Sequence, residues 1–186
     1  MGGVKIHDTP LPGLQLVESA VHSDQRGRFE RVFCDQAMAS LHPNLRISQA
    51  NLSTTLGRGS LRGLHYQAAP ALEAKLVRCL RGKVFDVAVD LRAGSPTFLK
   101  WHAVELSQDQ PRALFIPEGF AHGFQVLSDD AQLLYFHTAA WNPGCEGGVR
   151  HDDPALSIRW PLPAGAISDR DLQHPLLEAG FNGITT

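Results

Sequence analysis

Short β-forming segments separated by glycines constrain the fold of this chain more than any other feature. From Arg46 onward, stretches rich in Val, Leu and Phe are interrupted by Gly57, Gly59, Gly63, Gly82, Gly94 and Gly119. Short strands with turn residues between them are typical of a sandwich or jelly roll. We therefore expect an all-β protein, with strands that include residues 101–106, 113–116, 123–127 and 132–138.

The clearest local pattern lies between Lys75 and Leu91. Two apolar segments flank the dipeptide Arg81-Gly82, which predicts a hairpin with arms at 75–80 and 83–91. In the second arm, alternate residues form one apolar face and one face that carries Asp86 and Asp90. A surface strand explains this alternation as well as a barrel strand with a polar interior does.

The two ends of the chain differ from the middle. Residues 14–33 predict two strands around a polar loop at 23–27, and residues 34–41 predict a short helix that stops near Pro43. A second short helix is expected to start at Ser168, after a proline-rich stretch. No linker or internal repeat interrupts the sequence, so we expect residues 1–186 to form a single domain.

Composition excludes several classes of function. No apolar run approaches the length of a membrane helix, and a formal net charge of −2 with mixed signs predicts no binding to nucleic acid. The three cysteines form no C-x-x-C pair, which argues against a disulfide framework and a thiolate zinc site. The first residues do not resemble an export signal, so we expect a cytoplasmic protein.

Two histidine neighbourhoods indicate where chemistry occurs. Gly59, followed at a distance by His65, Gln67 and Glu73, approximates the first cupin motif, and residues 117–122 match the P-x-G-x-x-H core of the second. A cupin metal site usually has three imidazoles and a carboxylate. Here an amide replaces one imidazole and the glutamate is displaced along the chain, so we predict no metal.

Longer strings carry a resemblance to one family. They are Leu61–Gln67, Lys75–Arg78, Val84–Arg92, Gly94–Phe98, Ile116–Phe124, Asp152–Ala155 and Ser168–Asp171. In this order they resemble the dTDP-4-dehydrorhamnose 3,5-epimerase family over nearly the whole chain. The resemblance implies a cupin-type jelly-roll β-barrel with short helices near both termini. It also implies a cofactor-free epimerase that inverts carbon 3, carbon 5 or both of a nucleotide-linked, dTDP-type 4-keto-6-deoxyhexose.

The resemblance also implies four catalytic residues. They are the base His65, the carboxylate Asp171 that pairs with it, the acid Tyr135 on the opposite face of the sugar, and Lys75 beside the enolate oxygen. Each has a simpler interpretation. The Ser168-x-x-Asp171 spacing is a helix cap, a strand tyrosine is commonly a buried aromatic, and Lys75 resembles a solvated lysine at a strand end.

Further positions match residues through which the family binds its substrate. They are Arg26, Phe29, Gln49, Asn51, Arg62, His122, Trp141, Glu146 and Arg170. The resemblance places Arg26 and Phe29 in N-terminal strands that help to build the neighbour's nucleotide site in a homodimer. The sequence departs from the family pattern at Arg31, where a glutamate is usual, at Phe136-His137, and at Ala140-Trp141, where paired aromatics are usual.

Two other functions are weighed against an epimerase. The first is a metal-dependent cupin oxygenase or isomerase, which stoichiometric iron, manganese or nickel would indicate. The second is a nucleotide-sugar binding module without catalysis. The presence of His65, Lys75, Tyr135 and Asp171 together argues against the second, because a binding module needs no acid and base on opposite faces.

Overall fold

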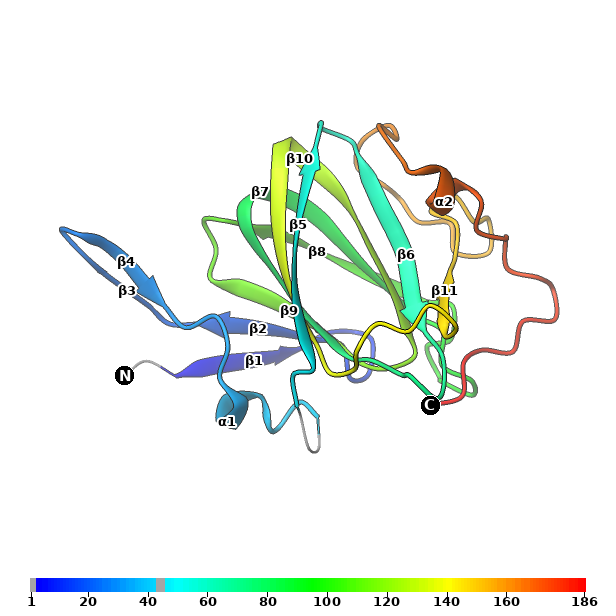
Figure 1. Ribbon diagram of the computed structural model, residues 1–186, viewed down its shortest axis with the longest axis horizontal. Coiled ribbons are helices and arrows are strands. Elements are labelled where there is room, and N and C mark those ends of the chain that lie inside the picture. Colours follow the sequence, from blue (N-terminus) through cyan, green and yellow to red (C-terminus); the bar gives the residue numbers. More distant parts are fainter. Residues whose placement is uncertain (1–2, 43–45) are drawn as a thin grey trace.

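The computed structural model describes residues 3–42 and 46–186, and most of its regular structure is β. In chain order the elements are β1 (Val4–Asp8), β2 (Gln15–Ser19), β3 (Val21–Asp24), β4 (Gly27–Glu30), α1 (Asp35–Met38), β5 (Gln49–Leu56), β6 (Leu61–Gln67), β7 (Lys75–Asp90), β8 (Trp101–Ser107), β9 (Arg112–Ile116), β10 (Phe120–His137), β11 (Glu146–Gly148) and α2 (Asp169–Leu172). The prediction of an all-β protein with short helices near the ends is confirmed (Figure 1). Within the described ranges, no helix is long and apolar enough to cross a membrane.

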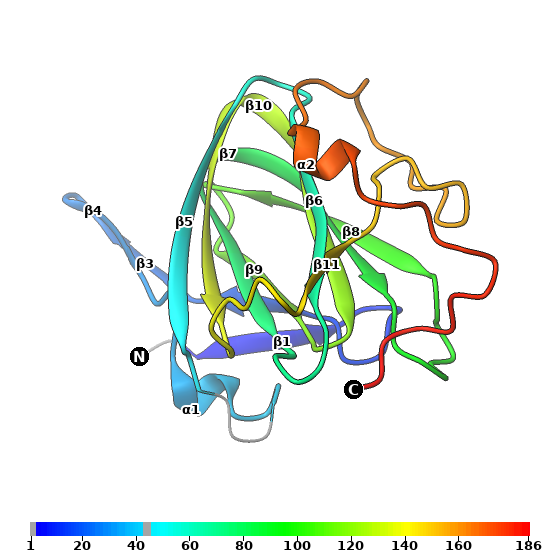
Figure 2. The same cartoon turned by 45° about the vertical axis from the view of Figure 1, so that its right-hand side comes forward.

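The long strands β7 and β10 belong to both layers of the barrel. The first part of β7 pairs with β9 and with the last part of β10, and β5 continues this layer on the other side of β10. The last part of β7 pairs with β8 and with the first part of β10, which β6 and β11 extend. One antiparallel pair therefore passes from one sheet to the other, and the two sheets enclose the interior (Figure 2).

The predicted hairpin at Arg81-Gly82 is wrong. β7 runs through this dipeptide without a turn, and the strands predicted at 123–127 and 132–138 are likewise parts of the single strand β10. Gly82 has a φ of +73°, and a Cβ on it would lie 2.1 Å from the carbonyl oxygen of Asp130. Turns and bulges both use glycine at positive φ, so the local sequence alone does not distinguish them.

The N-terminal segment also differs from the prediction. Residues 14–33 form three strands, of which β3 and β4 make a separate two-stranded hairpin that projects from the barrel (Figure 1). The helix α1 ends at Met38, earlier than predicted. Pro43, the predicted stop, lies outside the described residues.

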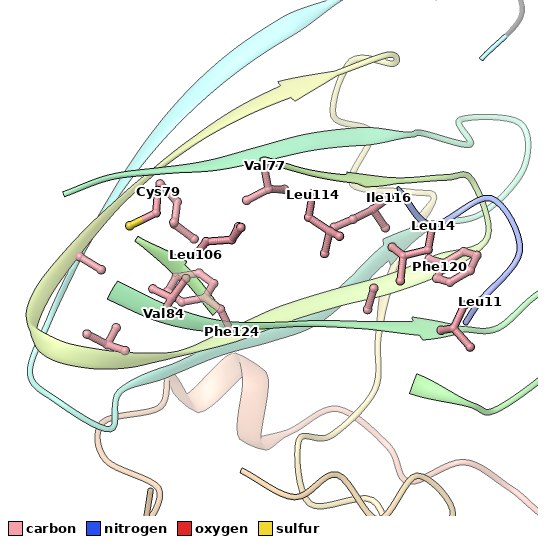
Figure 3. Packing of buried hydrophobic residues seen from close by; sticks show 14 residues of the cluster. Leu11, Leu14, Val77, Cys79, Val84, Leu106, Leu114, Ile116, Phe120 and Phe124 are labelled. Atoms are coloured by element: carbon pink, nitrogen blue, oxygen red, sulfur yellow. The ribbon is translucent and has the colours of Figure 1, made fainter. Parts of the chain in front are cut away.

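Alternation along the last part of β7 is confirmed, and both faces of the strand are buried. Val84 and Ala88 pack with side chains of both sheets in the barrel interior, where Figure 3 shows their neighbours pointing toward one another. Val87 and Val89, on the other face, pack against the C-terminal segment. The interpretation of this segment as a surface strand is therefore wrong.

Asp90, the last residue of β7, binds the segment that connects β7 to β8. Its side chain is fully buried and accepts hydrogen bonds from Arg92, Ser95 and Thr97 at 2.6–3.1 Å. Burial raises the pKa of Asp90, but these donors outweigh it and lower that pKa to about 2. The carboxylate is therefore ionised in the folded protein at every ordinary pH.

We predict that Asp90→Asn lowers the free energy of unfolding by about 2 to 4 kcal/mol at pH 7, because it removes the acceptor of a buried charged network. The pKa of Asp90 is lower in the folded state than its ordinary value of 3.8. The stabilisation is thus present above about pH 4 and is lost as pH falls toward 2.

Urea unfolding at pH 7, 4 and 2.5 should show that the stability deficit of Asp90→Asn shrinks at acid pH. The exposed Asp109→Asn is the control, and a deficit independent of pH would contradict the prediction.

Candidate active site

A cavity of about 260 Å³ opens in the barrel, and strands of both sheets line it. Figure 2 shows β5, β6, β7 and β10, the strands that supply most of its wall. Its lining residues are Gln49, Asn51, Ser53, Arg62, His65, Tyr66, Gln67, Glu73, Lys75, His122, Gly123, Phe124, Tyr135, His137, Trp141 and Glu146. Most of the residues singled out in the sequence thus meet in one pocket.

His65 and Asp171 form a close pair at one side of this pocket. His65 Nε2 lies 2.8 Å from Asp171 Oδ1, and the backbone N–H of Gly63 donates to Oδ2 at 3.0 Å. Burial raises the pKa of Asp171, but the hydrogen bonds from His65 and Gly63 outweigh it and lower that pKa to about 2. Because the ionised carboxylate occupies Nε2, the free nitrogen of His65 is Nδ1.

The helix α2 places Asp171 against β6. The backbone N–H of Asp171 donates to Ser168 Oγ at 3.1 Å, so the predicted helix cap exists. The carboxylate of the same residue holds His65, so the cap and the pair use different atoms and do not exclude each other. Gly63 allows β6 to approach β10 closely, since a Cβ on Gly63 would lie 2.6 Å from the Cα of Gly123 on β10.

Tyr135 lies on β10 between two histidines. Its ring is 5.9 Å from that of His122, edge to face, and 5.8 Å from that of His137, nearly parallel. Burial raises the pKa of Tyr135 well above its ordinary value, and the nearby Asp86 carboxylate adds to the shift. The phenol therefore stays protonated and is able to donate. It also packs against the interior cluster, as a structural aromatic does.

Lys75 is buried, so its interpretation as a solvated lysine is wrong. Its side chain is 10% exposed, and Nζ lies 3.0 Å from Glu73 Oε1 and 3.4 Å from the backbone oxygen of His65. Burial raises the pKa of Glu73, but hydrogen bonds from His137 and Lys75 outweigh it and hold that pKa below its ordinary value. The Lys75 ammonium thus reaches the strand that carries His65.

Four predicted binding residues meet at the rim of the pocket. The indole N–H of Trp141 donates to Glu146 Oε2 at 2.8 Å, and Arg170 Nη2 lies 2.5 Å from the same oxygen. The backbone N–H of Trp141 donates to Gln49 Oε1 at 3.0 Å. This contact network connects α2, which carries Arg170, to the start of β5.

The remaining predicted residues fall into two groups. Asn51, Arg62 and His122 line the pocket, with His122 Nε2 3.0 Å from both carboxylate oxygens of the fully buried Asp86. Arg26 and Phe29 lie on the projecting β3–β4 hairpin, outside the pocket of their own chain (Figure 1). Arg26 pairs with Asp24, and Phe29 is 75% exposed.

Glu73 and His137 line the pocket but have no role in the epimerase site that the sequence predicts. The sequence indicates Glu73 only as a displaced metal ligand and His137 only as a departure from the family pattern. The signal that identifies His137 is the two-residue period of a strand. His137 follows Tyr135 by two positions on β10, so the two side chains share a face. Glu73 precedes the start of β7 at Lys75, where no such period applies.

The residues of the cupin motifs do not gather as a metal site. Gln67 is held by backbone groups of Ala71, Ala140 and Asn142, and Glu73 is held by His137 and Lys75. In the described parts of the chain, the group of three metal-ligating side chains is instead His65, Asp171 and His174. That group contains the His65–Asp171 pair itself, and it is not the cupin ligand set.

The fold and the pocket together define a class of protein. A jelly-roll barrel of the cupin type holds a histidine paired with an ionised carboxylate, a protonated tyrosine and a buried ammonium group in one cavity. These groups match an isomerase that removes a proton beside a carbonyl and returns it.

Comparison with known proteins specifies the family. The family model for dTDP-4-dehydrorhamnose 3,5-epimerase matches residues 8–179. A dTDP-4-dehydrorhamnose 3,5-epimerase from Shigella flexneri is 42% identical over 88% of this chain and 91% of its own length. A dTDP-4-dehydrorhamnose 3-epimerase from Streptomyces niveus is 38% identical over 94% of this chain and 84% of its own length.

A solved structure agrees with these relatives. The dTDP-6-deoxy-D-glucose-3,5-epimerase from Legionella pneumophila Philadelphia 1, in complex with dTDP-4-keto-L-rhamnose, has a TM-score of 0.90 and 39% identity, over 97% of this chain and 98% of that one. The chain belongs to the dTDP-4-dehydrorhamnose 3,5-epimerase family. The resemblance seen in the sequence is confirmed.

The cap and the carboxylate of Asp171 yield a prediction that separates structure from catalysis. Asp171→Asn keeps the backbone N–H that caps α2 but removes the charge that holds His65, so catalysis should fall at least about a hundredfold, and the loss of a buried charged acceptor should also cost about 2 kcal/mol of stability. Ser168→Ala removes the cap acceptor and should cost about 1 kcal/mol of stability with a much smaller loss of rate. Thermal melts and turnover of both variants check this, and equal rate losses would contradict it.

Proposed function

We propose that this chain inverts carbon 3, carbon 5 or both of a dTDP-linked 4-keto-6-deoxyhexose. The observation that carries the proposal is the pairing of two opposite proton carriers in one pocket. His65 is held by an ionised carboxylate and has a free nitrogen, whereas Tyr135 is kept protonated by burial. The complex of the Legionella relative with dTDP-4-keto-L-rhamnose supports the substrate class.

The proton moves in two steps at each carbon that is inverted. His65 Nδ1 takes the proton from the carbon beside the C4 ketone, and the C–H electrons move to the ketone oxygen to give an enolate. The Asp171 carboxylate stabilises the imidazolium, and the Lys75 ammonium stabilises the enolate oxygen. Tyr135 then donates its proton to the opposite face as the electrons return to carbon. Solvent finally removes the proton from His65 and restores that of Tyr135.

Cationic groups near the cavity suit the diphosphate. Arg62 lines the pocket, with its Nε donating to Thr55 Oγ1 at 2.8 Å and its Nη2 to the Thr54 backbone oxygen at 3.5 Å, and its remaining donors suit a phosphate oxygen. Arg170 stands at the rim on the Glu146 carboxylate and is 57% exposed. We propose that these two arginines bind the diphosphate and that Asn51, His122 and the Gln49–Trp141–Glu146 rim contact the rest of the substrate.

Substitution of the acid and the base tests the proposal. We predict that His65→Asn lowers deuterium incorporation from D₂O at both carbons by at least about a hundredfold, because it removes the base. Tyr135→Phe should instead allow incorporation to persist while formation of the epimer falls sharply, because His65 can return deuterium to the original face. NMR of dTDP-linked 4-keto-6-deoxyhexoses measures incorporation and inversion at each carbon separately.

Three outcomes would contradict these roles. A His65→Asn variant that keeps more than about a tenth of wild-type exchange would remove His65 as the base. Equal loss of exchange and inversion in Tyr135→Phe would place Tyr135 in binding or enolate formation. A wild-type protein that binds the sugar nucleotide without exchange would favour a non-catalytic binding module.

We also propose a homodimer in which Arg26 and Phe29 contribute to the neighbour's nucleotide site. The support is the projection of the β3–β4 hairpin from the barrel, with Phe29 75% exposed at its surface (Figure 1). Leu52 and Leu56 on β5, which lies at one end of its sheet layer, are 58% and 70% exposed. A partner chain would cover such a surface.

The dimer predicts that Phe29→Asp weakens both association and nucleotide binding, since the hairpin would serve the neighbouring site. Light scattering combined with calorimetric titration of dTDP measures the two effects together. A monomeric wild-type protein with full activity at assay concentration would contradict the proposal.

The cytoplasm is the compartment that we propose for this activity. Cys34, Cys79 and Cys145 are free thiols, and Cys79 is buried. Free thiols without a disulfide are typical of a reducing compartment. Fractionation of cells that express the native gene would test this location.

A further inference from the structure

A chain of hydrogen bonds crosses the pocket from β5 to β6 and passes through His137. The Asn51 amide lies 3.4 Å from His137 Nε2, and His137 Nδ1 lies 2.8 Å from Glu73 Oε2. The other oxygen of Glu73 is 3.0 Å from the ammonium nitrogen of Lys75, which also donates to the backbone oxygen of His65 at 3.4 Å. The chain therefore ends on the strand of the proposed base.

Strand register explains why these groups meet. His137 on β10 is directly opposite Lys75 on β7. Glu73 contacts both side chains, one with each carboxylate oxygen, and all three side chains are at most 11% exposed. The carboxylate thus accepts from both side chains, one with each oxygen.

The contacts of His137 fix the position of its proton. The Glu73 carboxylate, whose pKa lies below its ordinary value, can only accept, so His137 Nδ1 carries a proton and donates it to Glu73. This N–H occupies the Glu73 oxygen that does not contact Lys75.

We propose that His137 is a positioning residue. By binding one oxygen of Glu73, His137 prevents Glu73 from pairing with Lys75 through both oxygens, and this keeps the Lys75 ammonium in the pocket. The proposal rests on the role given to Lys75 in the proposed function. Without the His137 donor, the buried Glu73 would have an oxygen without a partner, and it would turn this oxygen toward the nearest cation. Lys75 would then move toward Glu73, and its charge would be less available to the enolate oxygen.

The number of donors on Lys75 agrees with this role. An ammonium group has three N–H donors. Among the described residues, its hydrogen-bonded or paired acceptors are Glu73 Oε1 and the His65 backbone oxygen. One donor thus remains for the substrate, as long as Glu73 uses only one oxygen on the ammonium.

His137 also stacks on Tyr135, at 5.8 Å between ring centroids, so two variants are needed to separate its contacts. His137→Phe keeps an aromatic ring beside Tyr135 and removes the N–H. His137→Asn loses the ring but places an amide N–H where Nδ1 stood. If the hydrogen bond to Glu73 is what matters, the asparagine variant should resemble the wild type and the phenylalanine variant should not.

The experiment measures deuterium exchange into a dTDP-linked 4-keto-6-deoxyhexose at saturating and limiting substrate. We expect His137→Phe to lower kcat about tenfold, less than loss of a donor that touches the transition state directly, with KM changed less than about twofold. His137→Asn should recover most of this loss. Glu73→Gln combined with His137→Phe should be no slower than the slower single variant, because both changes break one chain. His102→Phe on β8, outside the pocket, is the control.

A crystal structure of the His137→Phe variant gives a result that does not depend on activity. We expect Lys75 Nζ to lie closer to Glu73 and farther from the His65 backbone oxygen than in the wild type. An unmoved Nζ overturns the proposal, as does a His137→Asn variant that loses as much kcat as His137→Phe. A wild-type protein without exchange would instead contradict the proposed function, and the position of Nζ would still test the role of His137.

Discussion

The pairing of β7 with β10 supports the rest of the structure. These two strands form the central ladder of both sheets, and every strand that lines the pocket is one of them or pairs directly with β10 or β6. Because the pair bends at Gly82 and Asp130, its two halves carry side chains from both layers into one interior. Lys75 and Tyr135 come from one half, and Asp86 and His122 come from the other.

Burial of charge is the cost that this arrangement has to offset. Each of the three histidines that line the pocket pairs with a carboxylate, His65 with Asp171, His122 with Asp86 and His137 with Glu73. A buried carboxylate without a partner would be protonated or would unfold the site. The pairs allow several ionisable groups to face one substrate. In the same region burial raises the pKa of Tyr135, whereas hydrogen bonds lower the pKa of Asp171.

Much of this fold and site could be predicted from the sequence, and the failures share a cause. Period-two alternation correctly assigned the two faces of the last part of β7, because that signal is local. It did not distinguish a bulge from a turn at Gly82, since the difference depends on Asp130, far along the chain. Motif matching brought His65, Lys75 and Tyr135 together, whereas the link from His137 to Lys75 depends on the register of β7 against β10, which composition does not contain.

The position of Asp171 outside the sheets has a consequence for how the molecule becomes active. Asp171 lies 106 residues after the histidine that it holds, on a segment that packs against the finished barrel, where the backbone N–H of Ile184 donates to the oxygen of Leu91. During synthesis, all the strands leave the ribosome before this carboxylate does. A barrel without its C-terminal segment would therefore have the pocket but a histidine without its counter-charge. Full activity thus reports that the last part of the chain has docked.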